Sequence, residues 1–277
     1  MPLQQAAREV RDSIGRAGLD VVALGAGDGK QEVRLVQHLL ATGERETAGD
    51  VRLYLLDISQ PLLSAAYQYA AEHVGSQGVY VCAIQGNFHH WPQYTQLHHA
   101  PERAHRRRLV VMLGNTVGNL DNEARFFQHT LTGLVPGDLL LMDVGLAFGS
   151  PDQPEEIKRS DRALSTGFQG AYQEWLSGPL ERYCVGAKSV SLRPSLDLRS
   201  AIPGSYAIDA LATVKLENGK QRRFSVFRFK RYDPERLGEV LRHLGWELLL
   251  SVPFGVEATH PVAALMLLRK FSRSQPA

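Results

Sequence analysis

The stretch VVALGAGDG, residues 21–29, is typical of a buried strand that runs into a glycine-rich turn and then a helix. Gly25 and Gly27 carry no Cβ, so the backbone can turn sharply there and approach a ligand closely. Gly29 is expected to keep the following helix near the sheet. Such turns often hold nucleotide-like cofactors, but they also occur as plain tight turns, so the rest of the sequence has to decide.

A second strand is predicted over residues 51–56, and it ends in Asp57. A carboxylate at that place can accept hydrogen bonds from both ribose hydroxyls of an adenosine cofactor. The alternative role for Asp57 is a helix cap, because Ser59 and Pro61 follow and proline suits a first helical turn. We favour the cofactor role, because Asp57 and the Gly25 turn lie at the same ends of neighbouring predicted strands.

Two further strand ends carry fitting groups. After the apolar run 79–84, Asn87 could face the exocyclic amine of adenine and Phe88 could flank its ring. The strand 109–113 is followed by GNTVGNL, residues 114–120, at the edge where open α/β sheets hold ligands. Together the four strand ends favour an adenosine cofactor over a bare turn. A nicotinamide cofactor is the weaker alternative.

The rest of the chain predicts a doubly wound α/β sheet with additions. An amphipathic helix over residues 3–18 could cover the cofactor cleft or the sheet edge, and another strand is expected over 139–144. Residues 147–203 show no clear strand. Asn218-Gly219 predicts a hairpin, and the strand-like runs of this region are 206–216, 221–231, 246–251 and 262–268, with a helix over 233–244. We therefore expect one domain, residues 1–277, with a cofactor core (20–146), an inserted cap on the substrate side (147–205) and a closing region (206–277).

Composition excludes several classes of protein. The 277 residues are 44% hydrophobic, enough for one large core, and the net charge of +2 gives no reason to expect nucleic acid. Cys82 and Cys184 lack Cys-x-x-Cys spacing, which argues against a disulfide framework and a cysteine zinc site. The chain shows no signal peptide and no membrane-spanning run, so we expect a cytoplasmic protein with no membrane contact.

Two clusters of basic residues raise the question of metal or phosphate binding. Five histidines fall within a 17-residue stretch, but without helical spacing or acidic neighbours they do not predict a metal site; they are His89, His90, His98, His99 and His105. Residues 106–108 are three arginines that could touch phosphate. Such a run is more often a solvated approach to a buried strand.

At this level of detail the chain resembles the histidine-specific methyltransferases that use S-adenosyl-L-methionine (SAM). The likeness is good over residues 20–150 and loose elsewhere. Residues 110–146 are similar to the family's FLGxTIGN signature with its following helix and strand, GNFHHWP (86–92) to its Gly-Asp-Phe-Glu-His segment, and LLDIS (55–59) to its second strand end. The resemblance implies a Rossmann-like class I methyltransferase fold and SAM as cofactor.

The resemblance also implies which residues bind. Those implied to bind SAM are Gly25, Ala26, Gly27, Gly29, Asp57, Ile58, Asn87, Phe88, Gly114 and Asn115. Asn119 is similar to the asparagine that holds the amino-acid substrate, and its alternative role is a turn or helix cap before Asp121. Arg228 could pair with a substrate carboxylate, although strand arginines usually reach solvent. The catalytic base is not identified.

The chain also departs from the family. Ala23 stands where an acidic residue usually contacts the methionyl amine of SAM, and Asn87 replaces an aspartate. Only about 20 residues precede the glycine turn, where the family carries a helical segment with tyrosines for the histidine pocket. Val226 and Arg228 stand at the places of a Glu-x-Ser pair. These departures argue against histidine as the substrate.

We therefore expect a SAM-dependent methyltransferase acting on a small molecule, most plausibly an amine nitrogen of an amino acid or a metabolite derived from one. One alternative is a degenerate partner subunit that binds SAM weakly or not at all. The other is an enzyme that methylates a peptide or protein side chain, which would need an open groove. A homodimer is an option, because a second protomer could supply the wall that the short N-terminus lacks.

Overall fold

The chain divides into two units in the computed structural model. Unit 1 comprises residues 1–144 and 237–277, and unit 2 comprises residues 145–236. The residues that the structure describes are 2–42, 51–94, 106–184, 186–255 and 261–271. Within them, no helix is long and apolar enough to cross a membrane.

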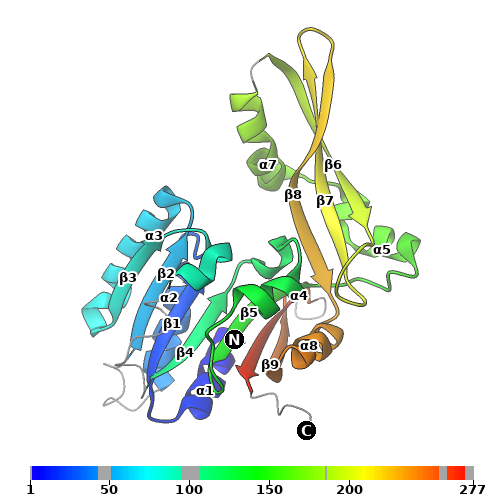
Figure 1. The fold of residues 1–277 in the computed structure, drawn as a ribbon. Coiled ribbons are helices and arrows are strands. Elements are labelled where there is room, and N and C mark those ends of the chain that lie inside the picture. Colours follow the sequence, from blue (N-terminus) through cyan, green and yellow to red (C-terminus); the bar gives the residue numbers. More distant parts are fainter. Residues whose placement is uncertain (1, 43–50, 95–105, 185, 256–260, 272–277) are drawn as a thin grey trace. The chain divides into compact units, whose positions relative to one another are not determined.

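Unit 1 is built on a sheet whose parallel strands run in the order β3-β2-β1-β4-β5 (Figure 1). Strand β10 then pairs with β5 and, antiparallel, with β9. The strands are β1 (Gly18–Leu24), β2 (Val51–Asp57), β3 (Tyr80–Gln85), β4 (Arg106–Met112), β5 (Leu139–Leu146), β9 (Trp246–Phe254) and β10 (Ala263–Lys270). The strand order reverses between β1 and β4, which is where such sheets bind ligands. The doubly wound α/β fold and the closing antiparallel pair are confirmed.

Helices cover this sheet. They are α1 (Pro2–Ile14), α2 (Lys30–Thr42), α3 (Gln60–His73), α4 (Glu123–Arg125) and α8 (Pro234–His243). The predicted apolar face of α1 is buried, and it consists of Ala6, Ala7, Val10 and Ile14. Because α1 contacts α2, β9 and β10, this helix packs on the sheet, and none of its residues lines the cavity described below.

The arginines that open β4 are held inside unit 1. Arg106 donates to Asp20 at 2.8 Å, and Arg108 pairs with Asp138 at 2.8 Å. All four side chains are almost fully buried. Buried ion pairs of this kind fix geometry, because a lost partner would leave an uncompensated charge. Arg106 and Arg108 are therefore fixed in the fold by buried ion pairs. The two roles considered from the sequence, contact with phosphate and a solvated approach to the strand, do not apply to them.

Unit 2 contains an antiparallel sheet in the order β8-β7-β6, with three helices. Its elements are α5 (Pro154–Ser160), α6 (Arg162–Thr166), α7 (Gly170–Tyr183), β6 (Ala187–Asp197), β7 (Tyr206–Leu216) and β8 (Gln221–Tyr232). The hairpin around Asn218-Gly219 is confirmed, with Gly219 at a positive φ of 79°. Strand β6 corrects the expectation of no strand before Tyr206: its polar residues and Pro194 conceal a strand that pairs with β7 along its length. Whether residues 147–205 form a cap over the substrate stays a prediction.

Candidate cofactor site

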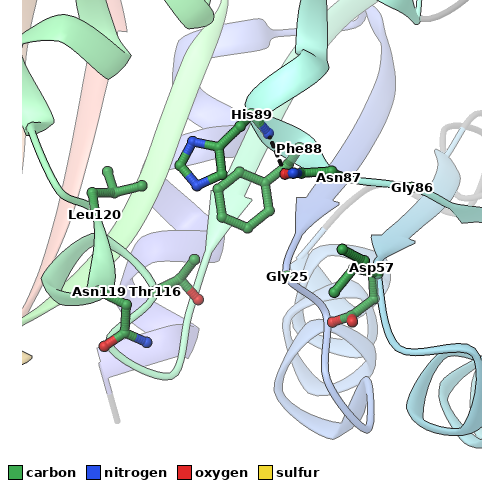
Figure 2. A pocket seen from close by; sticks show the side chains of 10 residues that line it. Gly25, Asp57, Gly86, Asn87, Phe88, His89, Thr116, Asn119 and Leu120 are labelled. Carbon is green, nitrogen blue, oxygen red and sulfur yellow. Dashed lines mark hydrogen bonds between the residues drawn. The ribbon is translucent and has the colours of Figure 1, made fainter. Parts of the chain in front are cut away.

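The turns that follow β1, β2, β3 and β4 enclose a cavity of about 310 Å³ in unit 1 (Figure 2). This volume lies at the lower end of the range for small-ligand pockets. Six of the predicted site residues line the cavity: Gly25, Asp57, Ile58, Asn87, Phe88 and Asn119. Gly86, His89, Thr116 and Leu120 complete the lining. The topological switch point therefore holds the pocket that the four strand ends predicted.

Gly25 keeps the floor of this cavity open. Its φ of +71° is a conformation that other residues rarely adopt. A Cβ built on Gly25 would stand 3.3 Å from Thr116 Cγ2 and 3.4 Å from Phe88 Cε1. A side chain at this position would enter the space that these two residues line. The glycine thus serves both of the purposes that the sequence suggested, a tight turn and a close approach.

Asp57 ties the glycine turn to the end of β2. Its carboxylate accepts the backbone N–H of Gly27 at 2.9 Å through one oxygen and that of Ser59 at 2.8 Å through the other. The side chain of Ser59 makes no capping bond at the start of α3. Asp57 therefore organises the start of α3 and the glycine turn together. Each carboxylate oxygen keeps a second lone pair that could accept a ribose hydroxyl.

Asp143, on β5, holds the turn after β4 in the same way. Its carboxylate accepts the backbone N–H of Gly114 at 3.1 Å and of Asn115 at 2.7 Å. The turn needs this support, because Asn115 has a positive φ of 61°. Burial raises the pKa of Asp143, and the two backbone donors act against that rise. Asp143 was not predicted as a site residue from the sequence, although a carboxylate inside the apolar run LLLMDV was a usable signal.

Asn87, Phe88 and His89 form the rim after β3. Asn87 Oδ1 accepts the backbone N–H of His89 at 3.0 Å, so part of the capacity predicted for adenine is already used. The rings of Phe88 and His89 stack at 4.7 Å, and Phe126 meets His89 edge-on at 5.8 Å. Figure 2 shows the imidazole beside the Phe88 ring at the cavity. Among the described residues, no group forms a hydrogen bond with the imidazole nitrogens.

Asn119 ends a 3-10 turn, Val117–Asn119, and lines the cavity. The cap of the next helix is Asn122, whose side chain accepts the backbone N–H of Arg125 at 2.8 Å. The helix-cap role considered for Asn119 is therefore wrong, whereas the turn is present. Within the described part of the chain, the Asn119 amide makes no hydrogen bond, which leaves it available to a ligand.

The other predicted cofactor residues do not line the cavity but belong to the turns around it. A Cβ at Gly29 would meet the Cβ of Ala66 at 2.8 Å, so this glycine permits close packing against α3. Ala26 is buried, and its backbone N–H donates to Leu56. Gly27, Gly114 and Asn115 contribute backbone N–H groups to Asp57 and Asp143. Direct contact of these five residues with a cofactor stays a prediction.

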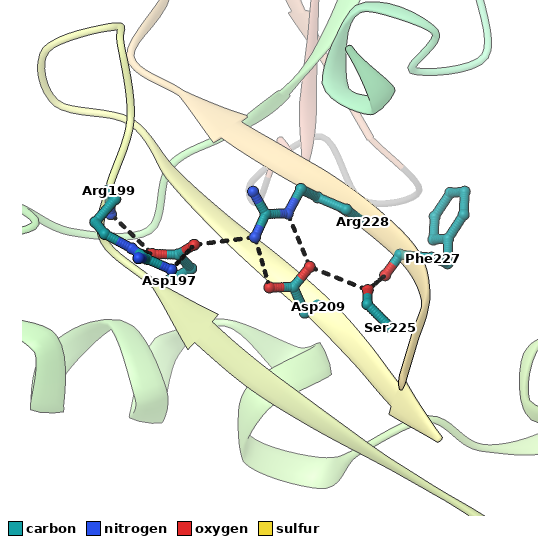
Figure 3. Close-up of polar contacts among 6 residues, drawn as sticks. All are labelled: Asp197, Arg199, Asp209, Ser225, Phe227 and Arg228. Carbon is teal, nitrogen blue, oxygen red and sulfur yellow. Dashed lines mark hydrogen bonds and ion pairs between the residues drawn. The ribbon is translucent and has the colours of Figure 1, made fainter. Parts of the chain in front are cut away.

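Arg228 lies in unit 2, on β8, and is engaged by two aspartates (Figure 3). Its guanidinium donates to both oxygens of Asp209 at 2.8 Å and to Asp197 at 2.9 Å. The hydrogen bonds with Asp209 raise the pKa of Arg228. Asp197 also accepts from Arg199, and this contact lowers the pKa of Asp197 to about 2. These ion pairs compete with any substrate carboxylate, and the predicted substrate role is untested.

The histidine stretch is only partly visible. His98, His99 and His105 lie outside the described residues. Within the described ranges, no group of three or more His, Cys, Asp or Glu side chains could hold a metal ion. Of the two visible histidines in this stretch, His89 lines the cavity.

Comparison with known proteins identifies the family. The family model described as histidine-specific methyltransferase, SAM-dependent, matches residues 2–158. The chain belongs to this family. The methyltransferase therefore uses SAM as its cofactor. None of the curated proteins gives a significant match to its sequence.

Several solved structures are similar to this methyltransferase. A SAM-dependent methyltransferase from Clostridium acetobutylicum ATCC 824 is 12% identical, with a TM-score of 0.48 over 98% of this chain and 93% of that one. The CcbJ methyltransferase from Streptomyces caelestis is 16% identical, with a TM-score of 0.47 over 98% and 91%. The glycopeptide N-methyltransferase MtfA in complex with SAM is 15% identical, with a TM-score of 0.45 over 96% and 93%.

The cavity of this methyltransferase fits the cofactor. The bare backbone at Gly25 leaves room that a side chain would fill. Asp57 offers acceptors for ribose hydroxyls, and the exposed Ile58 with Phe88 offers apolar surface for a purine ring. Residues of these types, gathered around one cavity at the switch point, are those that an adenosine cofactor requires.

Proposed function

We propose that this enzyme transfers the methyl group of SAM to a small molecule, at an amine nitrogen of an amino acid or of a metabolite derived from one. The observation that carries the proposal is the uncommitted Asn119 amide at the cavity, on the turn opposite Asp57 and Phe88. An amide offers both a donor and an acceptor, so it can orient a substrate amino or carboxylate group. Bound SAM supplies a methyl group made electrophilic by its positively charged sulfur.

The residues of the chain then act mainly by positioning. In the proposal Asp57 holds the ribose, while Ile58 and Phe88 flank the adenine. Asn119 fixes the acceptor so that its lone pair lies in line with the transferred methyl group. Closing the pocket around these groups removes water from the reacting atoms.

An amine has to lose its proton before it can attack. Two ionisable side chains line the cavity, Asp57 and His89. Both oxygens of Asp57 already accept backbone N–H groups, whereas the imidazole of His89 has no such engagement among the described residues. A neutral imidazole accepts protons in the physiological pH range. His89 is therefore the candidate base that the sequence could not identify.

The test uses two asparagines from one loop. Wild type, Asn119→Ala and Asn122→Ala are incubated with SAM and a panel of amino acids and amines, and methylated products are detected by mass spectrometry. We expect one amine to be methylated by wild type and by Asn122→Ala, because Asn122 only caps α4. In Asn119→Ala, kcat/KM should fall about 10-fold to 100-fold while SAM still binds, because one substrate hydrogen bond is worth about 1.5–3 kcal/mol when it involves a charged group.

Two results would contradict the proposal. Equal activity of Asn119→Ala and Asn122→Ala would remove Asn119 from the substrate site. Methylation of peptides in preference to every free amine would favour the alternative of a peptide or protein methyltransferase.

A further inference from the structure

Glu32 is a buried carboxylate to which the proposed mechanism gives no role. It lies in the first turn of α2, directly after the glycine turn, and only 4% of it is exposed. Its own backbone N–H interacts with the carboxylate, and among the described residues no lysine or arginine pairs with it. A buried carboxylate in this condition destabilises the fold, because its lost hydration is not replaced.

Glu32 lies at the edge of the sheet that carries the cofactor site, and the charged side chains that act on it are carboxylates. The pKa of Glu32 is raised to about 7, mainly by burial and to a smaller extent by the charges of Asp28, Asp143 and Asp57. Asp57 lines the cavity, and Asp143 holds the turn that leads to Thr116 and Asn119. Because α2 begins directly after the glycine turn, Glu32 lies at the same edge of the sheet as these residues. Asp28 is balanced by Lys30, whereas among the described residues no lysine or arginine pairs with Glu32.

The cofactor offers such a cation. The methionine part of SAM carries an α-ammonium group with three N–H donors, and a carboxylate is the matching acceptor. We propose that Glu32 binds the α-ammonium group of SAM. The inference rests on the cofactor site proposed above and adds to it a contact made from a helix, whereas Ala23 on β1 can make none.

A purely structural role of Glu32 would change ligand affinities in a different pattern. Acidic residues in a first helical turn interact favourably with the helix dipole, whatever ligand is bound. If Glu32 only stabilised α2, its loss would weaken all ligands of the cavity alike. If it binds the ammonium group, only ligands that carry this group should be affected.

The experiment therefore compares three ligands by isothermal titration calorimetry. SAM carries both the ammonium and the sulfonium charge, S-adenosylhomocysteine lacks the sulfonium charge, and 5′-methylthioadenosine lacks the whole amino-acid part. The variants are Glu32→Gln, which keeps size and polarity, and Asp28→Asn as the matched control. Asp28 lies in the same turn, but its side chain is 51% exposed and pairs with Lys30.

We expect Glu32→Gln to raise the Kd of SAM and of S-adenosylhomocysteine about tenfold or more, and to leave that of 5′-methylthioadenosine within about twofold. Asp28→Asn should change none of the three. An equal loss for all three ligands, no loss at all, or a loss for SAM alone would overturn the proposal. Wild type that binds none of the ligands would instead refute the cofactor site itself.

Discussion

The cavity of unit 1 and the charged cluster of unit 2 use the same residue types in opposite ways. In unit 1, Asp57 and Asp143 accept backbone N–H groups, and Glu32 and Asn119 are left without side-chain partners among the described residues. In unit 2, Arg228 is paired with Asp197 and Asp209. Asn119 is exposed, whereas Glu32 is buried, and a buried polar group that lacks a partner costs stability and is kept where a ligand supplies the partner. The comparison therefore separates a binding site from a structural cluster.

The largest effect is expected at Glu32, through stability. The native state keeps a proton on Glu32 up to about pH 7, whereas the ordinary pKa is 4.5. The unfolded chain loses this proton first, so native stability should fall as the pH rises between these two values. Glu32→Gln should remove this loss and stabilise the SAM-free protein at pH 8 by on the order of 2–3 kcal/mol, with little gain at pH 4.

Urea unfolding of both proteins at pH 4, 6 and 8 measures this difference. Asp28→Asn serves as the control, because that carboxylate is half exposed. Stability curves of wild type and Glu32→Gln that run parallel over this pH range would show that Glu32 is not a strained carboxylate.

The next effect concerns two aspartates, one from each unit. Asp57→Ala removes both the support of the glycine turn and the proposed ribose acceptors, so the Kd of SAM should rise about 10-fold to 100-fold. Asp197→Ala should leave that Kd unchanged, because Asp197 is engaged by Arg199 and Arg228. Calorimetric titration of SAM measures both values. Similar Kd values of SAM for the two variants would contradict the conclusion that the binding site is in unit 1 and that the charged cluster of unit 2 is structural.

The third effect compares two glycines of one turn. Gly25→Ala and Gly27→Ala both place an alanine at positive φ, which costs roughly 1–2 kcal/mol of stability in each case. Only at Gly25 does the new Cβ approach Thr116 and Phe88, whereas nothing lies within 4 Å of a Cβ at Gly27. SAM affinity should therefore fall about tenfold further in Gly25→Ala. Thermal unfolding and SAM titration separate the two contributions, and equal affinities would contradict the shape of the cavity.

The smallest effect is expected in unit 2. Arg228→Ala should lower stability by about 1 kcal/mol, since its guanidinium is partly exposed, and should leave SAM affinity unchanged. The pKa of Asp197, now about 2 against an ordinary 3.8, should rise only in part, because Arg199 remains. A depressed carboxyl pKa stabilises the fold above the ordinary value, so this stabilisation is lost as the pH falls from about 4 to 2.

Carboxyl NMR titration and urea unfolding report on this cluster. A raised KM for the amine substrate in Arg228→Ala, with stability unchanged, would instead support the substrate role that the sequence suggested for Arg228.

Much of unit 1 could be predicted from sequence, because its signals are local. Buried parallel strands appear as continuous apolar runs, and a glycine turn has its own chemistry, so β1, β2 and β4 and the edge that carries the site could be placed in advance. The amphipathic face of α1 was likewise visible in its spacing. Strand β6 was not, because its exposed residues and Pro194 carry no apolar pattern.

The sequence by itself determined the order of strands in unit 1, the family and the residues gathered at the strand ends. Only the tertiary structure decided which of those residues face the cavity and which hold its turns. Asp143 reaches Asn115 across 28 residues, and Arg228 reaches Asp197 across 31, so neither pairing leaves a local pattern. The burial of Glu32 without a partner likewise depends on what packs around α2. Side-chain partners and burial arise from long-range contacts, which a periodicity of two or 3.6 residues does not encode.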